Sequence, residues 1–521
     1  MPAISAMWRK LAFYFLCGFL FEMALSLLSA ILPEGWLSDE IHNFANISNF
    51  PIMVRIESAG FIGLLVGFIV VVSFWGFIVF LIMRLLRKAC ACFHLSRRQR
   101  LVLRYAMGFL ILISLMWAFI ITRNQSPIPF TTSPDIKSVV DGNTIFAIDL
   151  YQRLKDRPGN LFFSPYSISS GLAMTYAGAR GETKTEIART LHFDPTQTNL
   201  PEAFSALDAR MRQIQRWYYI TLSSANSLWG QKDHPFSDEY INLIHTQFGA
   251  EARPVDFIRA PAAVSAQINK WVRGKTKGNI EAIVGPDQFD QNSRLVLCNA
   301  IYFKGKWIQQ FKVSETKPSD FTISSNQTLT VPMMRQKSKF KTARNNDFTL
   351  ELLEMPYVGK DLSMIILLPA KTHFSEAGNE EPLTLADLER ELTPDNLSNW
   401  LMVLDQSSPH ETWVSLPRFT TTQSLDLKKE LAAMGMGLAF ADGADFSGMN
   451  RSTNLYLANV LHKAFVQVNE SGTEAAAVTW MEAKTKSQSD RFIVDHPFIF
   501  LIRDNGSGNI LFIGRIVDPT K

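Results

Sequence analysis

The residue types that catalyse reactions are scattered along this 521-residue chain. The zinc-peptidase motif H-E-x-x-H, the nucleophile motif G-x-S-x-G and the glycine-rich phosphate loop are all absent, and the histidines stand singly. A single histidine is more often a hydrogen-bonded structural residue than a catalyst. The sequence therefore predicts neither an enzyme nor a cofactor.

The densest group of potential metal ligands is "CACFH" at residues 90–94. It lacks a fourth ligand and the usual spacing of a zinc site, so no metal is predicted. Cys90 and Cys92 are instead expected to be lipidated or inert cysteines beside a membrane. Cys298 is the only cysteine after residue 134, so that part of the chain is expected to contain no internal disulfide.

A different chemistry is suggested by "VNESGTEAAAVTWMEAKTKSQSD" at residues 468–490, a long stretch without proline or an aliphatic run. Loops of this length are uncommon and are usually functional or disordered. Every second position is uncharged: Thr473, Ala475, Ala477, Thr479, Met481, Ala483 and Thr485. The charged and bulky residues lie between them: Glu474, Val478, Trp480, Glu482 and Lys484. Because successive residues of a strand face opposite sides, this sorting predicts a segment that can become a central strand.

The elements before this region are of two kinds, and they meet near residue 134. Three apolar stretches, at residues 11–32, 60–83 and 105–122, have the length needed to cross a bilayer as helices and show no polar face. We therefore expect three transmembrane helices within residues 1–122 and a lipid bilayer as a partner.

The first stretch has an alternative interpretation as a cleavable signal. Arg9 and Lys10 precede it, and "LSA" at 28–30 resembles a cleavage site. Glu22 interrupts its apolar region and two further spans follow, which favours a retained helix.

Basic residues predict the orientation of the spans. Residues 84–104 contain seven Arg or Lys and no acid, whereas residues 33–59 contain four acids and one Arg. We expect a multi-pass protein with a cytoplasmic amino terminus and a large domain that is periplasmic or extracellular. Residues 1–134 carry 11 basic and 5 acidic residues, +6, which leaves 4 − 6 = −2 for the remainder. No nucleic-acid partner is therefore predicted.

The large domain is expected over residues 135–521, after a proline-bearing tether at 123–134. Helical patterns dominate its first half, and strand-like runs such as "RLVLCNAIYFKGKW" and "HPFIFLIRD" follow without a βαβ rhythm. This order indicates an α+β fold.

Six segments of this domain closely resemble the serpin family, in order: "NLFFSPYSISSGLAMTYAGARGETKTEIARTLHF", "LVLCNAIYFKGKW", "VPMMRQKSKF", "ADFSGM", "HKAFVQVNESGTEAAAV" and "HPFIFLIRDNGSGNILFIGRIVDP". The resemblance implies three β-sheets, about nine helices and a suicide inhibitor of serine proteases. The three-span region departs from the family pattern, so nothing about it follows from the resemblance.

In family terms, residues 470–492 resemble the reactive loop. Its hinge would comprise Glu470, Gly472, Thr473, Glu474, Ala475, Ala476 and Ala477. Family spacing, counted from Gly472 and from Pro497, implies cleavage between Lys486 and Ser487, so the expected partner is a trypsin-like serine protease. Arg491 is the competing basic residue.

The resemblance also implies a region where a sheet opens to admit the loop. Its residues would be Ser164, Ser167, Asn299 and His462 beneath the sheet, and Trp307 with an Arg418–Glu470 pair at the loop's entry. Ordinary core packing is the alternative interpretation of each.

The predicted function is a membrane-anchored inhibitory serpin. The alternatives are a non-inhibitory, membrane-tethered carrier or chaperone, and a transport or signalling protein with a serpin as its sensor domain. Asn469 is an N-glycosylation acceptor within the hinge, and a glycan there would obstruct insertion. This favours a bacterial periplasm, or an unoccupied acceptor, over a heavily glycosylating compartment.

Overall fold

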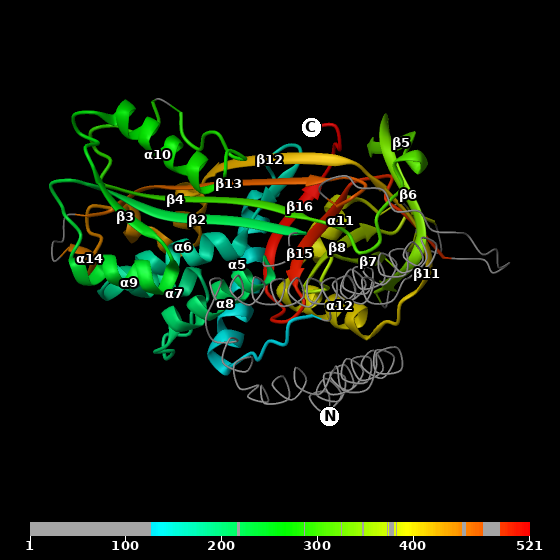
Figure 1. The fold of residues 1–521 in the computed structure, drawn as a ribbon, viewed down its shortest axis with the longest axis horizontal. Coiled ribbons are helices and arrows are strands. Elements are labelled where there is room, and N and C mark those ends of the chain that lie inside the picture. The colour runs from blue at the N-terminus through cyan, green and yellow to red at the C-terminus, as the bar shows by residue number, and fades with distance from the viewer. Residues whose placement is uncertain are drawn as a thin grey trace, which may run out of the picture. The chain divides into compact units, whose positions relative to one another are not determined.

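The computed structural model of the chain describes residues 127–521, except 216–218, 286, 325, 346–348, 372, 375–379, 382, 451–454 and 473–489 (Figure 1). All of these residues belong to the unit Phe119–Lys521. The predicted spans at 11–32, 60–83 and 105–122 lie outside the described residues. No helix of the described part is both long and apolar enough to cross a bilayer.

Ten α-helices occur in the described residues, against about nine predicted, and two of them have only four residues. Three begin at a Ser-Pro or Thr-Pro pair, in which the hydroxyl caps the helix and proline occupies the first turn. The helices are α5 (Pro134–Leu154), α6 (Pro165–Gly178), α7 (Gly181–Thr190), α8 (Leu200–Ile214), α9 (Asp238–Phe248), α10 (Pro261–Lys275), α11 (Leu385–Glu391), α12 (Pro394–Gln406), α13 (Lys428–Leu431) and α14 (Ser447–Asn450).

A five-stranded sheet runs along one side of the molecule in the order β12-β13-β4-β2-β3 (Figure 1). Two of its neighbouring pairs, β13 with β4 and β2 with β3, are parallel, and the others are antiparallel. The strands are β2 (Ile220–Gln231), β3 (Glu251–Val255), β4 (Leu295–Gly305), β12 (Phe419–Asp426) and β13 (Leu457–Val468).

The other strands form two sheets that share the long strand β6 (Gln327–Arg344). Residues 327–340 of β6 pair with β5 and β11, and residues 341–344 pair with β7. The strands are β1 (Leu161–Phe163), β5 (Lys317–Ser324), β7 (Leu350–Pro356), β8 (Leu362–Pro369), β11 (His410–Pro417), β14 (Asp490–Ile493), β15 (Phe498–Asp504) and β16 (Ile510–Ile516). A small hairpin joins β9 (His373–Phe374) to β10 (Glu380–Glu381). The α+β fold with three main sheets is as predicted.

Helices cover both faces of the five-stranded sheet. α6 contacts β2, β4 and β16, and twelve of its residues are buried. α10 contacts β2 on the other face, over a separate apolar cluster that includes Trp229, Trp271 and Val296. Alternate residues of β4 therefore enter different cores: Leu297 joins the main one and Val296 the one beneath α10. This double burial explains why β4 has almost no polar residue.

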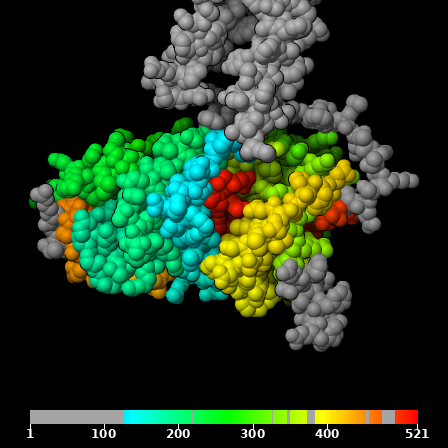
Figure 2. Space-filling model, turned by 90° about the horizontal axis from the view of Figure 1, so that it is seen from below, coloured from blue at the N-terminus to red at the C-terminus, as the bar shows by residue number. Residues whose placement is uncertain are grey.

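Residues 127–133, within the predicted tether, contain no helix or strand, but part of this segment is bound to the domain. The Ile128 amide donates to Asp361 Oδ1 at 2.8 Å, and the Ile128 carbonyl accepts from Arg210 Nη1 at 2.9 Å. Arg210 also binds Asp361 and Asp504, and all three charged side chains are fully buried. Seen from below, the cyan start of the described chain lies beside the red carboxyl-terminal part (Figure 2).

Candidate functional site

The parallel pairing of β4 with β13 is the feature on which the site depends. His462 of β13 lies opposite Asn299 of β4, and the register continues to Val466 opposite Phe303. The segment that is predicted to be the reactive loop follows β13 in the chain. A chain that leaves β13 and turns back between the two strands would run antiparallel to both of them. The sheet could therefore accept this segment as a sixth strand.

A buried polar cluster bridges β13, β4 and α6. His462 Nε2 accepts from the Ser164 amide at 3.2 Å, so Nδ1 carries the proton and donates to Asn299 Oδ1. Asn299 Nδ2 donates to the Ser167 carbonyl at 2.9 Å and also to Asn226 Oδ1. The four residues predicted to lie beneath the sheet, Ser164, Ser167, Asn299 and His462, are thus brought together.

Ser164 and Ser167 also hold the start of α6 in place. Ser164 Oγ caps the helix by accepting from the Ser167 amide at 3.1 Å and donates to the Leu511 carbonyl at 2.6 Å. Ser167 Oγ lies 3.0 Å from Ser224 Oγ of β2. Complete burial lowers the pKa of His462 to about 3, so its imidazole is neutral at physiological pH.

The start of the hinge is hydrogen-bonded to the chain that follows β4. The Trp307 amide donates to the Ser471 carbonyl at 2.9 Å, and the Phe311 amide donates to the Glu470 carbonyl at 2.8 Å. Trp307 Nε1 donates to the Asn469 carbonyl at 3.1 Å. These bonds join the ends of β13 and β4 and must break if a new strand enters there.

Glu470 supplies a charged contact at the same point. Its carboxylate accepts a hydrogen bond from Arg418, as predicted, and another from Thr316 Oγ1 at 2.7 Å. Burial favours the neutral form of Glu470, but these two hydrogen bonds outweigh it and lower its pKa. Glu470 is therefore an anion at neutral pH.

Gly472 adopts a conformation that only glycine fits. Its φ is +107°, and a Cβ built there would lie 2.1 Å from the Gly305 carbonyl oxygen and 2.6 Å from the Trp307 nitrogen. Gly472 also pairs with Asn469 through two backbone hydrogen bonds of 3.0 Å. The hinge is held in a tight turn against the end of β4.

The structure describes only some of the other predicted site residues. Trp307 is buried and stacks on Tyr357, with ring centroids 4.4 Å apart. Lys486 and Ser487 lie outside the described residues, as do Thr473, Glu474, Ala475, Ala476 and Ala477. The reactive bond itself therefore remains a prediction.

Sequence reasoning missed several partners of these residues: Thr316, Tyr357, Asn226 and Ser224. Asn226 and Ser224 lie among several polar residues of β2, so the sequence around them gave no distinctive signal. In the part of the chain that the structure describes, no group of His, Cys, Asp and Glu residues could hold a metal ion. Cys298 is buried, which raises the pKa of its thiol.

Comparison with known proteins gives the family. The model of the family described as "Serpin (serine protease inhibitor)" matches residues 141–519. Leukocyte elastase inhibitor of Bos taurus is 41% identical over 381 residues, which is 72% of this chain and 98% of the relative.

Solved serpin structures resemble the fold over the same part of the chain. Uncleaved ovalbumin matches with a TM-score of 0.65 at 28% identity, over 73% of this chain and all of that one. Serpin48, a highly specific serpin of the insect Tenebrio molitor, matches with a TM-score of 0.64 at 29% identity, over 75% of this chain and 99% of that one. The chain therefore belongs to the serpin family of serine protease inhibitors and, as the sequence predicted, is an inhibitor and not an enzyme.

Proposed function

We propose that this protein is a membrane-anchored serpin that traps trypsin-like serine proteases covalently after cleavage between Lys486 and Ser487. The observation that carries the inhibitory mechanism is the parallel contact of β13 with β4, at whose end the hinge begins. A parallel pair in the centre of a sheet leaves a place that an antiparallel strand can fill.

The chemistry requires the protease to start an ordinary cleavage. Its serine Oγ attacks the Lys486 carbonyl, the bond to the Ser487 nitrogen breaks, and the Ser487 amine leaves with a proton. Lys486 is then joined to the protease as an ester. If the fourteen residues from Thr473 to Lys486 enter the sheet at about 3.3 Å each, the ester is carried about 45 Å before water can cleave it.

The interactions that resist insertion are local. Three backbone or indole hydrogen bonds close the hinge, and Glu470 is bound by Arg418 and Thr316. A neutral hydrogen bond contributes about 1 kcal/mol net, and one to a charged group about 1.5 to 3 kcal/mol. A fully antiparallel sheet with a new strand would gain more, so the uncleaved form is held by a kinetic barrier.

The specificity proposal rests on Lys486. A long cationic side chain at the scissile bond fits a specificity pocket with an acid at its base. The similar leukocyte elastase inhibitors are named for a different target, so their names do not support trypsin-like specificity. Measuring the inhibition of both trypsin and elastase distinguishes trypsin-like specificity from elastase specificity.

The anchoring proposal rests on the apolar stretches at 11–32, 60–83 and 105–122. With residues 84–104 cytoplasmic, the domain that follows the tether faces the periplasm or the cell exterior. The inhibitor would then act on proteases that reach the outer face of the membrane.

The decisive experiment mixes the purified full chain with trypsin and with elastase, followed by denaturing electrophoresis. We expect trypsin to give an SDS-stable band at the sum of the protease and the serpin cleaved at Lys486. Lys486→Ala should lose this band, while the control Arg491→Ala keeps it. Trapping by Lys486→Ala at the normal rate would place the reactive bond elsewhere. Cleavage without any band would favour a non-inhibitory serpin.

Topology needs a separate test. Trypsin added to intact cells or spheroplasts that express the full chain should cleave or be trapped at the loop without lysis. Protection of the loop until the cells are lysed would contradict the proposed orientation.

A further inference from the structure

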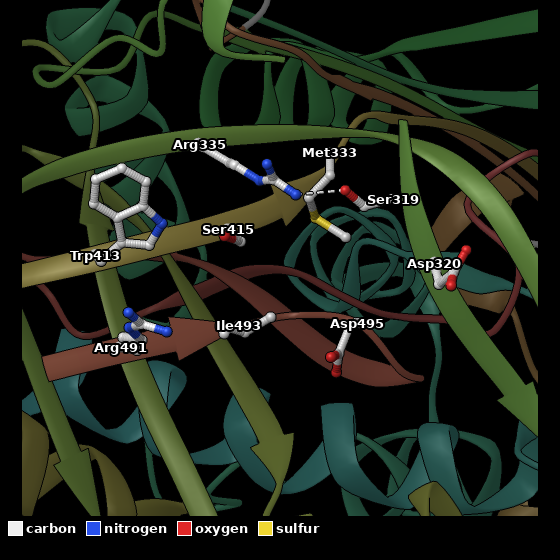
Figure 3. A pocket seen from close by; sticks show the side chains of 9 residues that line it. All are labelled: Ser319, Asp320, Met333, Arg335, Trp413, Ser415, Arg491, Ile493 and Asp495. Carbon is white, nitrogen blue, oxygen red and sulfur yellow. Dashed lines mark hydrogen bonds between the residues drawn. The ribbon is translucent and has the colours of Figure 1, made fainter. Parts of the chain in front are cut away.

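A surface pocket of about 480 Å³ lies beside the point where the reactive loop rejoins the fold. It is lined by strands β5, β6, β11 and β14, and its walls include Arg335, Trp413, Ser415, Arg491 and Ile493 (Figure 3). Trp413 and Arg491 lie at one end of the pocket, and Asp320 and Asp495 lie at the other (Figure 3).

The sheet register explains why cations surround the tryptophan. Trp413 is the Cα partner of Lys337 on one side and of Arg491 on the other. Two residues further along β11, Ser415 is the partner of Arg335 and of Ile493. Because residues two apart face the same side of a sheet, both rows lie on one surface.

Some charged side chains on this surface have an ion-pair partner among the described residues and others do not. Lys337 pairs with Glu411 at 3.1 Å, and Asp495 is held by Lys371 and His496 at 2.7 and 2.9 Å. Arg335 donates only to Ser319 Oγ, at 2.6 Å, and neither Arg335 nor Arg491 has an ion-pair partner among the described residues. Two guanidinium groups are thus available to an incoming anion.

Trp413 adds an apolar contact to these charges. Among the tryptophans of the described residues it alone is exposed, at 37%. An exposed tryptophan flanked by arginines has the composition of a protein-binding surface.

The position of the pocket determines what can occupy it. Arg491 follows Lys486 by five residues, a separation of at most about 18 Å even in a fully extended chain. A protease domain has a radius on the order of 20 Å. A protease whose active site holds Lys486 must therefore lie over or beside the pocket.

We propose that this pocket is a secondary docking site for acidic side chains on the surface of the target protease. The inference rests on the proposed inhibitory function and adds a requirement to it: the preferred protease carries Asp or Glu beside its active-site cleft. Arg491 and Arg335 bind these carboxylates, and Trp413 packs against their apolar surroundings. Such contacts raise the rate of encounter and leave the later chemistry unchanged.

The test uses the full chain with charge reversals, Arg491→Glu and Arg335→Glu, singly and together. We expect the double variant to inhibit trypsin with a second-order rate constant reduced about tenfold or more at low salt. The stoichiometry of inhibition should stay unchanged, because insertion is not affected. The matched control is Arg189→Glu on α7, at the opposite end of the molecule from β11 (Figure 1).

A charge swap identifies the occupant. Trypsin variants with single surface Asp or Glu residues changed to Lys are measured against the wild-type inhibitor and Arg491→Glu. One trypsin variant should react more slowly with the wild type and faster with Arg491→Glu. A rate that falls equally with every trypsin variant, for the wild-type inhibitor and for Arg491→Glu alike, would mean that only the net charge of the protease matters, and would overturn the proposal.

The two proposals fail in different ways. If the unaltered chain forms no covalent complex with any protease, the inhibitory function itself is wrong. If the complex forms and the double reversal reacts at the wild-type rate at both low and high salt, only the docking site is wrong.

Discussion

His462 and Asn299 lie opposite each other on the parallel strands β13 and β4 and share a hydrogen bond inside the sheet. Leu461 beside His462, and Cys298 and Ala300 beside Asn299, are apolar and buried. The pair also binds α6, through the Ser164 amide and the Ser167 carbonyl. Opening the sheet at this point breaks a connected set of buried hydrogen bonds, each expensive to leave unmade.

The buried imidazole makes the sheet sensitive to acid. Burial lowers the pKa of folded His462 to about 3, against about 6.5 in an unfolded chain. The unfolded chain therefore binds more protons between these two values, and stability is lost as the pH falls below 6.5. Between pH 6.5 and pH 5 the free energy of unfolding would fall by about 2 kcal/mol. The thermal midpoint, scanned at one rate from pH 7.5 to 4.5, should fall.

His462→Gln is the matched variant, because its amide can replace both hydrogen bonds without titrating. We expect a lower midpoint at pH 7.5 and a smaller fall toward pH 5 than in the wild type. Parallel curves for the two proteins would show that other groups cause the acid sensitivity.

Gly472→Ala should destabilise the uncleaved form selectively. The added Cβ would meet the Gly305 carbonyl oxygen at 2.1 Å, and the φ of +107° is strained for alanine. After cleavage and insertion the residue leaves this turn, so the inserted form should tolerate alanine. We expect a lower thermal midpoint for the intact protein and no change for the loop-cleaved protein.

Gly159→Ala provides the control for this substitution. Gly159 has a φ of +80°, but no atom lies within 4 Å of a Cβ built there. Gly159→Ala would therefore introduce backbone strain without a steric clash of the added Cβ. Equal losses in the two variants would mean that strain alone, and not contact with the end of β4, accounts for the effect.

Thr473→Arg should convert the inhibitor into a substrate. The alternation of side chains predicts that Thr473 turns into the sheet on insertion, where a guanidinium without a partner would cost several kcal/mol, on the order of 2 to 7. Trypsin should then cleave the loop and be released, which raises the stoichiometry of inhibition. Glu474→Arg, one residue further on and outward-facing, should still trap. Normal trapping by Thr473→Arg would argue against insertion in this register.

The fold and the polar cluster could be predicted because they rest on motifs and on strand periodicity. The family resemblance placed Asn299 and His462 in one polar cluster, and the structure joins them by a hydrogen bond. The second partner of Glu470, Thr316, comes from another part of the chain with no local pattern. Contacts of this kind depend on tertiary packing, which neither spacing nor propensity encodes.

The contacts of the segment before α5 could not be predicted from the sequence either. Its prolines and lack of periodicity predict a stiff tether, and residues 127–133 contain no regular element. Nothing in the sequence of that segment indicates that Ile128 binds a buried ion triad, because Arg210, Asp361 and Asp504 lie 82 or more residues away. The contact depends on where three distant elements meet.

This contact leads to a prediction about where the folded domain begins. A chain that starts at Thr131 keeps the Ser133 cap of α5 but loses both hydrogen bonds of Ile128, to Asp361 and from Arg210. Hydrogen bonds to charged groups contribute about 1.5 to 3 kcal/mol each, and water can replace part of the loss here. We expect a start at Thr131 to lower the free energy of unfolding by about 2 to 4 kcal/mol relative to a start at Pro127.

The measurement compares thermal midpoints and rates of trypsin trapping for the full chain and for chains that begin at Pro127 and Thr131. Trapping should persist in all three, since both hydrogen bonds of Ile128 go to Arg210 and Asp361 and neither goes to the predicted hinge or to β4. Equal midpoints for Pro127 and Thr131 would show that Arg210, Asp361 and Asp504 satisfy one another without the segment. A start at Thr131 that abolished trapping would instead mean that the triad supports the opening sheet.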